Sequence, residues 1–298
     1  MIISSPPVPR LRKSRKGGPT ASVGRVGELR LEYARRDQKT VIARSRCTSP
    51  WHLLPPIYLD NTGSAYTLLL NPSGGLVGGD HLSIDMALDA EAHVLISAPS
   101  ANRVYRSMGE VSVQEIEIAV GPGAVLEWLP EHTIPFAGAR FRQSIHVQLG
   151  AGATVLLWDA LASGRIARGE RWGFTSLENE IRITTASGAS VMERYALAPV
   201  EPLGGLGLAE EWDYVGSLFI IGDMIETDVL TSLETEFAAI LEAYPGDVLG
   251  GVSQPAVSGL VVKLLARSAP DLAAILEALW GAVRRTLWNL NPVALRKY

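Results

Sequence analysis

The stretch that decides the fold runs from residue 71 to residue 108 and reads NPSGGLVGGDHLSIDMALDAEAHVLISAPSANRVYRSM. Two glycine pairs, Gly74-Gly75 and Gly78-Gly79, come directly before Asp80 and His81. Glycines are used where the backbone must adopt positive φ or approach another group closely. An alternating strand follows, and its apolar side chains share one face: Leu82, Ile84, Met86 and Leu88. The stretch therefore predicts a sharp turn that delivers a carboxylate and an imidazole to the start of a strand.

A pattern that begins in this stretch recurs three more times. Each copy is a small-residue turn, then an alanine, then a strand that starts with apolar or β-branched residues; the alanines are Ala92, Ala124, Ala153 and Ala189. They lie 32, 29 and 36 residues apart, and such self-similarity marks units that bury their faces by stacking on one another. No periodic helix pattern interrupts residues 66–197, which argues against an α/β fold. We expect a mainly-β body of layered antiparallel strands with β-solenoid-like character.

The flanks define the rest of the domain organisation. Residues 1–22 are rich in Pro, Ser, Gly and basic residues, and we expect a disordered basic tail. Residues 23–298 then form a single domain, with a β body over about 23–200 and a loop and helical part over about 201–298. Within the body, apolar and polar residues alternate over residues 29–43 on both sides of Arg36-Asp37-Gln38, which is typical of a β-hairpin.

Two to three helices are expected after Pro202. One would begin at a capping box formed by Thr231 and Glu234 and run to about residue 244. A second would span about 255–267, and a third would start at Ser268, with Asp271 three residues further on. Their apolar faces must pack on the β body or on a partner.

Composition excludes several classes of protein. A net charge of −4 gives no reason to expect nucleic-acid binding. Cys47 is the only cysteine, which suits a reducing compartment and rules out an intrachain disulfide. There is no apolar run of about 18 residues and no secretory signal pattern, so we expect a cytoplasmic protein without a membrane span.

The chemical motifs do not predict an enzyme. The glycine-rich turn is followed by a strand and carries no lysine, unlike a P-loop or a dinucleotide fingerprint. Asp80, His81 and Asp85 point apart on a strand, so they do not predict a compact metal site. Glu127 and Asp159 occupy similar places in successive repeats. Acids that stack in this way would suit the passage of a cation better than catalysis.

Several blocks together resemble the UreD (also called UreH) family of urease accessory proteins, from about residue 24 to the C-terminus. The blocks are LLLNPSGGLVGGDHLSIDMAL, APSANRVYRSMG, GAVLEWLPEHTIPFAGAR and GRIARGERW. The chain departs from the family's usual EWLPQE, because Glu131 and His132 follow Pro130 here. The residues that carry the resemblance are Asn71, Pro72, Gly74, Gly75, Gly78, Gly79, Asp80, Tyr105, Arg106, Ser107, Glu127, Trp128, Leu129, Pro130, Gly164, Arg165, Gly169 and Glu170.

The resemblance implies a β-rich, solenoid-like fold and no catalysis by the chain itself. It implies binding to apo-urease and, with UreF and the GTPase UreG, help in delivering nickel to the urease active site. Transient Ni²⁺ rather than a tightly bound cofactor is then expected, held by exchangeable oxygen ligands along an internal acidic path. The candidate path residues are Asp80, Asp85, Glu127, Asp159 and Glu170. The C-terminal helices would form part of the surface that faces UreF.

Two other functions compete with this one. A stand-alone β-solenoid carbohydrate-binding protein or enzyme would use the acids in an open groove, but the seven tryptophans show no repeated exposed pattern. A metal-storage role is disfavoured because His and Cys are few and dispersed.

Overall fold

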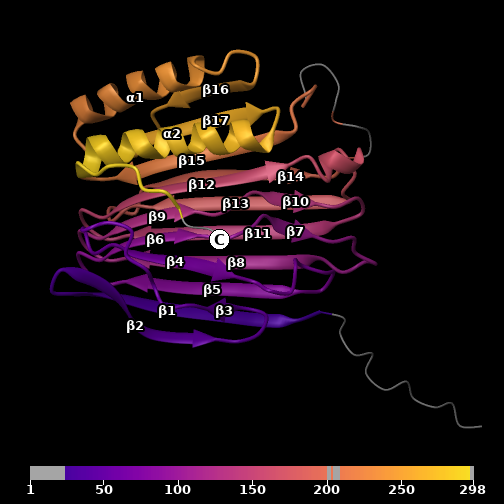
Figure 1. Cartoon of the computed structure of the whole chain (residues 1–298), viewed down its shortest axis with the longest axis horizontal. Coiled ribbons are helices and arrows are strands. Elements are labelled where there is room, and N and C mark those ends of the chain that lie inside the picture. The colour runs from indigo at the N-terminus through magenta and orange to yellow at the C-terminus, as the bar shows by residue number, and fades with distance from the viewer. Residues whose placement is uncertain (1–23, 200–202, 204–208, 296–298) are drawn as a thin grey trace, which may run out of the picture.

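Two stacked β-sheets and two helices make up the computed structural model, which describes residues 24–199, 203 and 209–295 (Figure 1). The expected basic tail over residues 1–22 lies outside the described residues. The first sheet has seven strands in the order β14 (Ser190–Leu197), β13 (Ser176–Thr184), β11 (Arg140–Leu149), β8 (Ser112–Val120), β5 (His81–Leu88), β1 (Val26–Arg36) and β2 (Lys39–Cys47).

The second sheet has ten strands. Its main path is β16 (Val248–Ser253), β17 (Gly259–Ala266), β15 (Tyr214–Gly222), β12 (Thr154–Ala162), β9 (Val125–Leu129), β6 (His93–Ser97), β4 (Ala65–Leu70) and β3 (His52–Leu53). Two short strands, β10 (Thr133–Pro135) and β7 (Asn102–Val104), extend sideways from β12. A 3₁₀ turn, η1 (Ile166–Arg168), follows β12.

The mainly-β, solenoid-like architecture is confirmed, because each repeat contributes one strand to each sheet. Strand β5 passes to β6, β8 to β9 and β11 to β12, and strands of successive layers pair in parallel. Antiparallel pairs flank these parallel layers: β1–β2 and β13–β14 in the first sheet, and β3–β4 and the run β16–β17–β15–β12 in the second. The expectation of antiparallel layers was therefore wrong for the middle of the molecule.

The repeated turns explain why the layers are in register. Backbone N–H groups of Gly121 and Gly150 donate to carbonyls of the preceding layer, at Leu88 (2.8 Å) and Val120 (2.7 Å). The alanine of each of these turns is buried: Ala92, Ala124 and Ala153. Ala189 is exposed, because the fourth copy of the pattern closes a hairpin within one sheet instead of crossing to the other.

Alternation along the strands produces two apolar cores. One lies between the sheets and contains Leu82, Trp128 and Leu157. The other lies between the ten-stranded sheet and the helices, and it contains Leu156, Phe237 and Trp280. The β1–β2 hairpin is present as expected, with Asp37 at positive φ in its turn.

Helices α1 (Thr227–Glu242) and α2 (Ala269–Trp288) lie together at the β15–β17 end of the ten-stranded sheet (Figure 1). Ser268 caps α2 as expected, accepting a hydrogen bond from the Asp271 N–H. The capping box at Thr231 was wrong: α1 starts earlier, and the Thr231 hydroxyl donates to the Thr227 carbonyl inside the helix. Neither described helix combines the length and apolar character that a membrane crossing requires.

The helix expected over residues 255–267 is instead strand β17. This strand lies between β15 and β16 and is buried on both faces over Gly259–Val262. A short apolar run that is covered on both sides has no alternation, so its sequence does not distinguish a strand from a helix.

Candidate functional site

A cavity of about 310 Å³ lies between the two sheets. Apolar side chains such as Trp51, Leu82 and Trp128 line part of it. The remaining lining is polar and includes Asn102, Gln114, Glu131, Thr133, Gln143 and Asp159. Buried polar groups need partners, so the cavity wall is built around a hydrogen-bonded network.

A row of amide side chains crosses the inner face of the seven-stranded sheet. Gln143 of β11 lies in register with Gln114 of β8 and with Asn179 of β13, and Tyr195 of β14 continues the row. The Gln143 Nε2 donates to Asn179 Oδ1 at 3.0 Å, and the Asn179 Nδ2 donates to the Tyr195 hydroxyl at 3.2 Å. We call these four residues the amide row.

Asp159 reaches the amide row from the opposite sheet. Its Oδ1 accepts from Gln143 Nε2 and its Oδ2 from Asn179 Nδ2, both at 3.0 Å. Burial raises the pKa of Asp159 to about 6, and the two amide donors and the charge of Lys263 offset this rise only in part. Asp159 is thus a carboxyl group that changes charge close to neutral pH.

The Lys263 ammonium group lies near Asp159 on the same sheet. Asp159, Ser217 and Lys263 are neighbours in register across β12, β15 and β17. The Lys263 ammonium donates to the Ser217 hydroxyl at 2.9 Å and forms an ion pair with Glu193. Burial lowers the pKa of Lys263 to about 8, against the opposing effect of Asp159.

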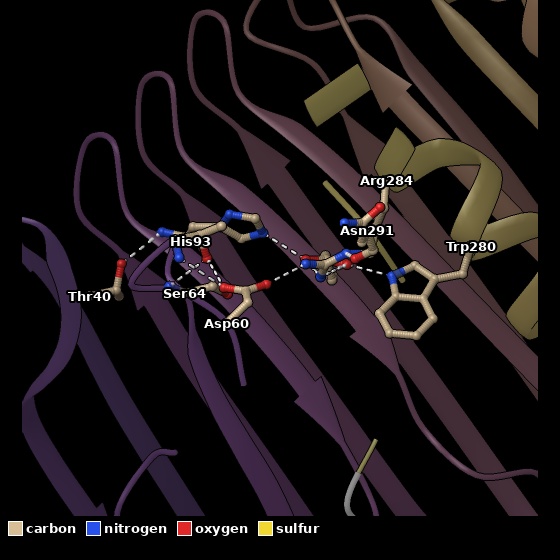
Figure 2. Close-up of polar contacts among 9 residues, drawn as sticks. Thr40, Asp60, Ser64, His93, Trp280, Arg284 and Asn291 are labelled. Carbon is tan, nitrogen blue, oxygen red and sulfur yellow. Dashed lines mark hydrogen bonds and ion pairs between the residues drawn. The ribbon is translucent and has the colours of Figure 1, made fainter. Parts of the chain in front are cut away.

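Glu127 faces the other way, toward α2, where it contacts Trp280 and Arg284. Figure 2 shows Trp280 and Arg284 with the neighbouring Asp60 and His93. The Glu127 side chain is 0% exposed, and its carboxylate accepts from Trp280 Nε1 at 2.5 Å and from Arg284 Nη1 at 3.0 Å. The His93 ring lies 2.7 Å away. Arg284, 1% exposed, also binds Asp60 at 2.7 Å and the Asn291 carbonyl at 3.2 Å. These contacts attach α2 to β6, β9 and the loop before β4.

The other three candidate acids lie outside the cavity. Asp80 is buried in the glycine-rich turn, where its two oxygens accept from the backbone N–H groups of Arg25 (2.8 Å) and Val77 (2.9 Å). Asp85 is exposed on the outer face of β5. Glu170 forms a two-point ion pair with Arg165 on the loop after β12, and this pairing holds the pKa of Glu170 below its usual range.

The five acids therefore do not form the single line that their positions in the repeats suggest. Glu127 aligns with Leu156, so Asp159 projects from the opposite face of the sheet. Of the five candidate acids, only Asp159 lines the inter-sheet cavity. Glu131, which is not one of the five, lines it as well. Within the described part of the chain, no group of three or more His, Cys, Asp and Glu side chains is arranged to hold a metal ion.

Sequence reasoning missed two parts of this arrangement. The amide row left a detectable signal: Gln143 and Asn179 interrupt the apolar series of strands FRQSIHVQL and SLENEIRIT. The Arg284–Asp60 pair left none, because its members are 224 residues apart. Such a contact depends on how α2 docks.

The glycine turn and the loops that carry the other family motifs gather at one end of the molecule. The Tyr105 N–H donates to the Leu76 carbonyl at 2.8 Å, and the Tyr105 hydroxyl donates to Gly74 at 3.1 Å. Gly74, Gly75 and Gly79 adopt positive φ in this turn. A Cβ on Gly75 would lie 2.4 Å from the Arg103 carbonyl, so this close approach requires glycine.

Comparison with known proteins identifies the family. A model of the UreD urease accessory protein family matches residues 25–297. The urease accessory protein UreD of Deinococcus radiodurans is 34% identical over 286 residues, covering 94% of this chain and 99% of that protein. The UreD proteins of Cupriavidus necator (29% over 272 residues; 90% and 92% covered) and Ralstonia nicotianae (31% over 278 residues; 90% and 92% covered) are also similar. This match spans both sheets, both helices and the cavity, and the chain belongs to the UreD family of urease accessory proteins.

Proposed function

We propose that this chain is a urease maturation factor without turnover of its own. It binds apo-urease in the cytoplasm and, with UreF-like and UreG-like proteins, assists insertion of nickel into the urease active site. Family membership supports the role in urease maturation. The observation that carries the nickel step is the cavity between the sheets, in which Asp159 is held by two amides.

The chemistry of the cavity suits transfer more than storage. Carboxylate and amide oxygens hold Ni²⁺ less tightly than imidazole or thiolate, and a passage must release what it binds. Asp159 supplies a charged ligand and Glu131 lines the same space. We narrow the proposed nickel path to these two residues. None of Asp80, Asp85, Glu127 and Glu170 lines the cavity.

The test is complementation of cells that carry urease and its accessory proteins but lack this chain. Wild type, Asp159→Asn and Asp85→Asn are compared, the last as a matched loss of one exposed carboxylate. The readouts are nickel per urease by mass spectrometry, urease activity, and recovery of apo-urease with the tagged chain.

We expect little nickel in urease without the chain, a several-fold deficit with Asp159→Asn despite normal complex recovery, and normal loading with Asp85→Asn. Normal nickel loading in the absence of the chain overturns the proposed function. Normal loading with Asp159→Asn rejects only the assignment of Asp159. Glu127 is unsuitable for this test, because its removal leaves the buried Arg284 without its main partner.

A further inference from the structure

Three loops beside the glycine turn form one continuous surface. They comprise residues 103–110, 136–140 and 163–172, and we call them the arginine platform. Each loop is bonded to the next: Ser107 N–H donates to the Gly138 carbonyl at 3.1 Å, and Ala137 N–H donates to the Glu170 carboxylate at 3.3 Å. The first loop begins within β7, and the other two follow β10 and β12; these three strands lie side by side in the ten-stranded sheet.

Side chains make the platform rigid. Tyr105 packs edge-on against Phe136 with ring centroids 4.9 Å apart, and the Arg165 guanidinium lies 4.3 Å above the Phe136 ring. Glu170 fixes Arg165 from the other side through two hydrogen bonds. One interaction chain thus joins all three loops, so a partner meets a preformed surface.

The platform has a charge opposite to that of the whole chain. Its 23 residues contain six arginines and two glutamates, a formal charge of +4 against −4 for the whole chain. Arg165 is paired with Glu170, and Arg171 is paired with Asp213 outside the platform, which leaves a net charge of +3. Arg103 and Arg106 are exposed and form no ion pair with any described acid. Met108 at the tip is 96% exposed. Arginine, methionine and aromatic residues are the types enriched at protein interfaces.

The platform also borders the inter-sheet cavity, whose lining includes Gly74, Gly75 and Arg103. Guanidinium groups here repel a free divalent cation from this side of the cavity. A partner that covers them with carboxylates removes the repulsion and supplies oxygen ligands at the same place.

From this charge, rigidity and position, we propose that the arginine platform docks an acidic surface of a protein partner in the urease maturation complex. The identity of the partner rests on the proposed function; the acidic chemistry rests on the platform alone. Docking there places a carboxylate-rich surface next to the cavity that contains Asp159.

The test reverses the charge of three exposed arginines in the full chain: Arg103→Glu, Arg106→Glu and Arg168→Glu. The matched control makes the same change on the β2 side of the molecule, with Arg36→Glu, Arg44→Glu and Arg46→Glu. A third variant keeps the charge, with lysine at the three platform positions. Thermal unfolding confirms that each variant folds. Binding to purified apo-urease and to the UreF-like protein is measured separately by interferometry at low and at high salt.

We expect the platform reversal to weaken binding to one of these proteins at least tenfold, with the control and lysine variants close to wild type and with weaker binding at high salt. Unchanged affinity of the platform reversal for both proteins overturns the proposal. If wild type binds neither protein, the proposed function has failed. Binding of poly-L-glutamate then tests separately whether the platform binds an acidic ligand. Loss of poly-L-glutamate binding in the reversal variant then supports an acidic ligand, and equal binding rejects it.

Discussion

At the scale of single residues, three carboxylates of this chain have different tasks because their surroundings differ. Asp80 accepts two backbone N–H groups and closes a turn. Glu127 balances a buried guanidinium. Asp159 accepts hydrogen bonds from two side-chain amides, lies near Lys263 without a direct ion pair, and faces a cavity.

Asp80→Ala should lower the free energy of unfolding by about 2–4 kcal/mol, because two turn N–H groups lose their acceptor. Asp85→Ala, which removes an exposed carboxylate from the outer face of β5, should change the free energy of unfolding by less than about 0.5 kcal/mol. Urea denaturation followed by tryptophan fluorescence measures both. A small effect of Asp80→Ala would show that water replaces the carboxylate in the turn.

The stability of the wild type should fall as Asp159 ionises. Its pKa is raised from 3.8 to about 6 in the folded state, so the folded state binds this proton more tightly than the unfolded chain. The resulting stabilisation is complete below pH 3.8 and is lost as the pH rises through 6. Its size is at most about 3 kcal/mol, and less where cavity water solvates the carboxylate.

The measurement compares the unfolding free energies of wild type and Asp159→Asn between pH 4.5 and pH 8. Their difference should shift in favour of the asparagine variant as the pH rises, since the other titrating groups largely cancel. A difference that is independent of pH contradicts the raised pKa.

At the scale of elements, the two helices begin in different ways. Ser268 accepts a hydrogen bond from the Asp271 N–H at 3.3 Å at the start of α2, whereas Glu226 at the start of α1 makes no side-chain cap. Ser268→Ala should therefore cost about 1 kcal/mol of stability, and Glu226→Ala much less. Thermal unfolding of the two variants gives the comparison, and equal losses would contradict it.

Elements were predictable where one face is apolar and the other polar. The β1–β2 hairpin, the strands beside the repeated turns and helix α2 all show such patterns, and all are present. Strand β17 was not predictable, since it is covered on both faces and its apolar run is continuous. Thr231 and Glu234 match a capping box in sequence, but Leu230 is also buried and extends the apolar face of α1 towards its N-terminus.

At the scale of the whole molecule, the Glu127–Arg284 pair joins residues 157 positions apart and holds α2 on the ten-stranded sheet. Arg284→Met alone should cost about 3–5 kcal/mol, because it leaves Glu127 charged and buried. The double variant Glu127→Leu with Arg284→Met should be clearly more stable than the sum of the single losses predicts. Chemical denaturation of the four proteins of this double-mutant cycle gives the coupling energy, and additive losses would contradict the pairing.

The layered body was predictable from the turn repeat, whereas the site was predictable only in part. Asp159 was among the expected acids, and the structure places it in the cavity. The expected line of acids does not form, because residues an odd number of positions apart on a strand point to opposite faces of the sheet. Aligning Ala124 with Ala153 sets Glu127 opposite Leu156, and Asp159, three residues beyond Leu156, must face the other way. The strand direction and the partners of Arg284 depend on long-range docking, which no local pattern specifies.

The distance in sequence between α2 and the strands that it covers leads us to expect a particular order of folding. Successive turns of the body lie 32 and 29 residues apart in the sequence, so we expect each layer to pair with the previous one early in synthesis. Helix α2 follows every strand, so the nascent chain on the ribosome carries Glu127 and the apolar face around Leu156 uncovered until Arg284 has emerged. We expect a chain stalled on the ribosome before that residue to have formed its sheets while the apolar face around Leu156 remains exposed to solvent. Such an exposed apolar surface is prone to aggregation and is bound by chaperones.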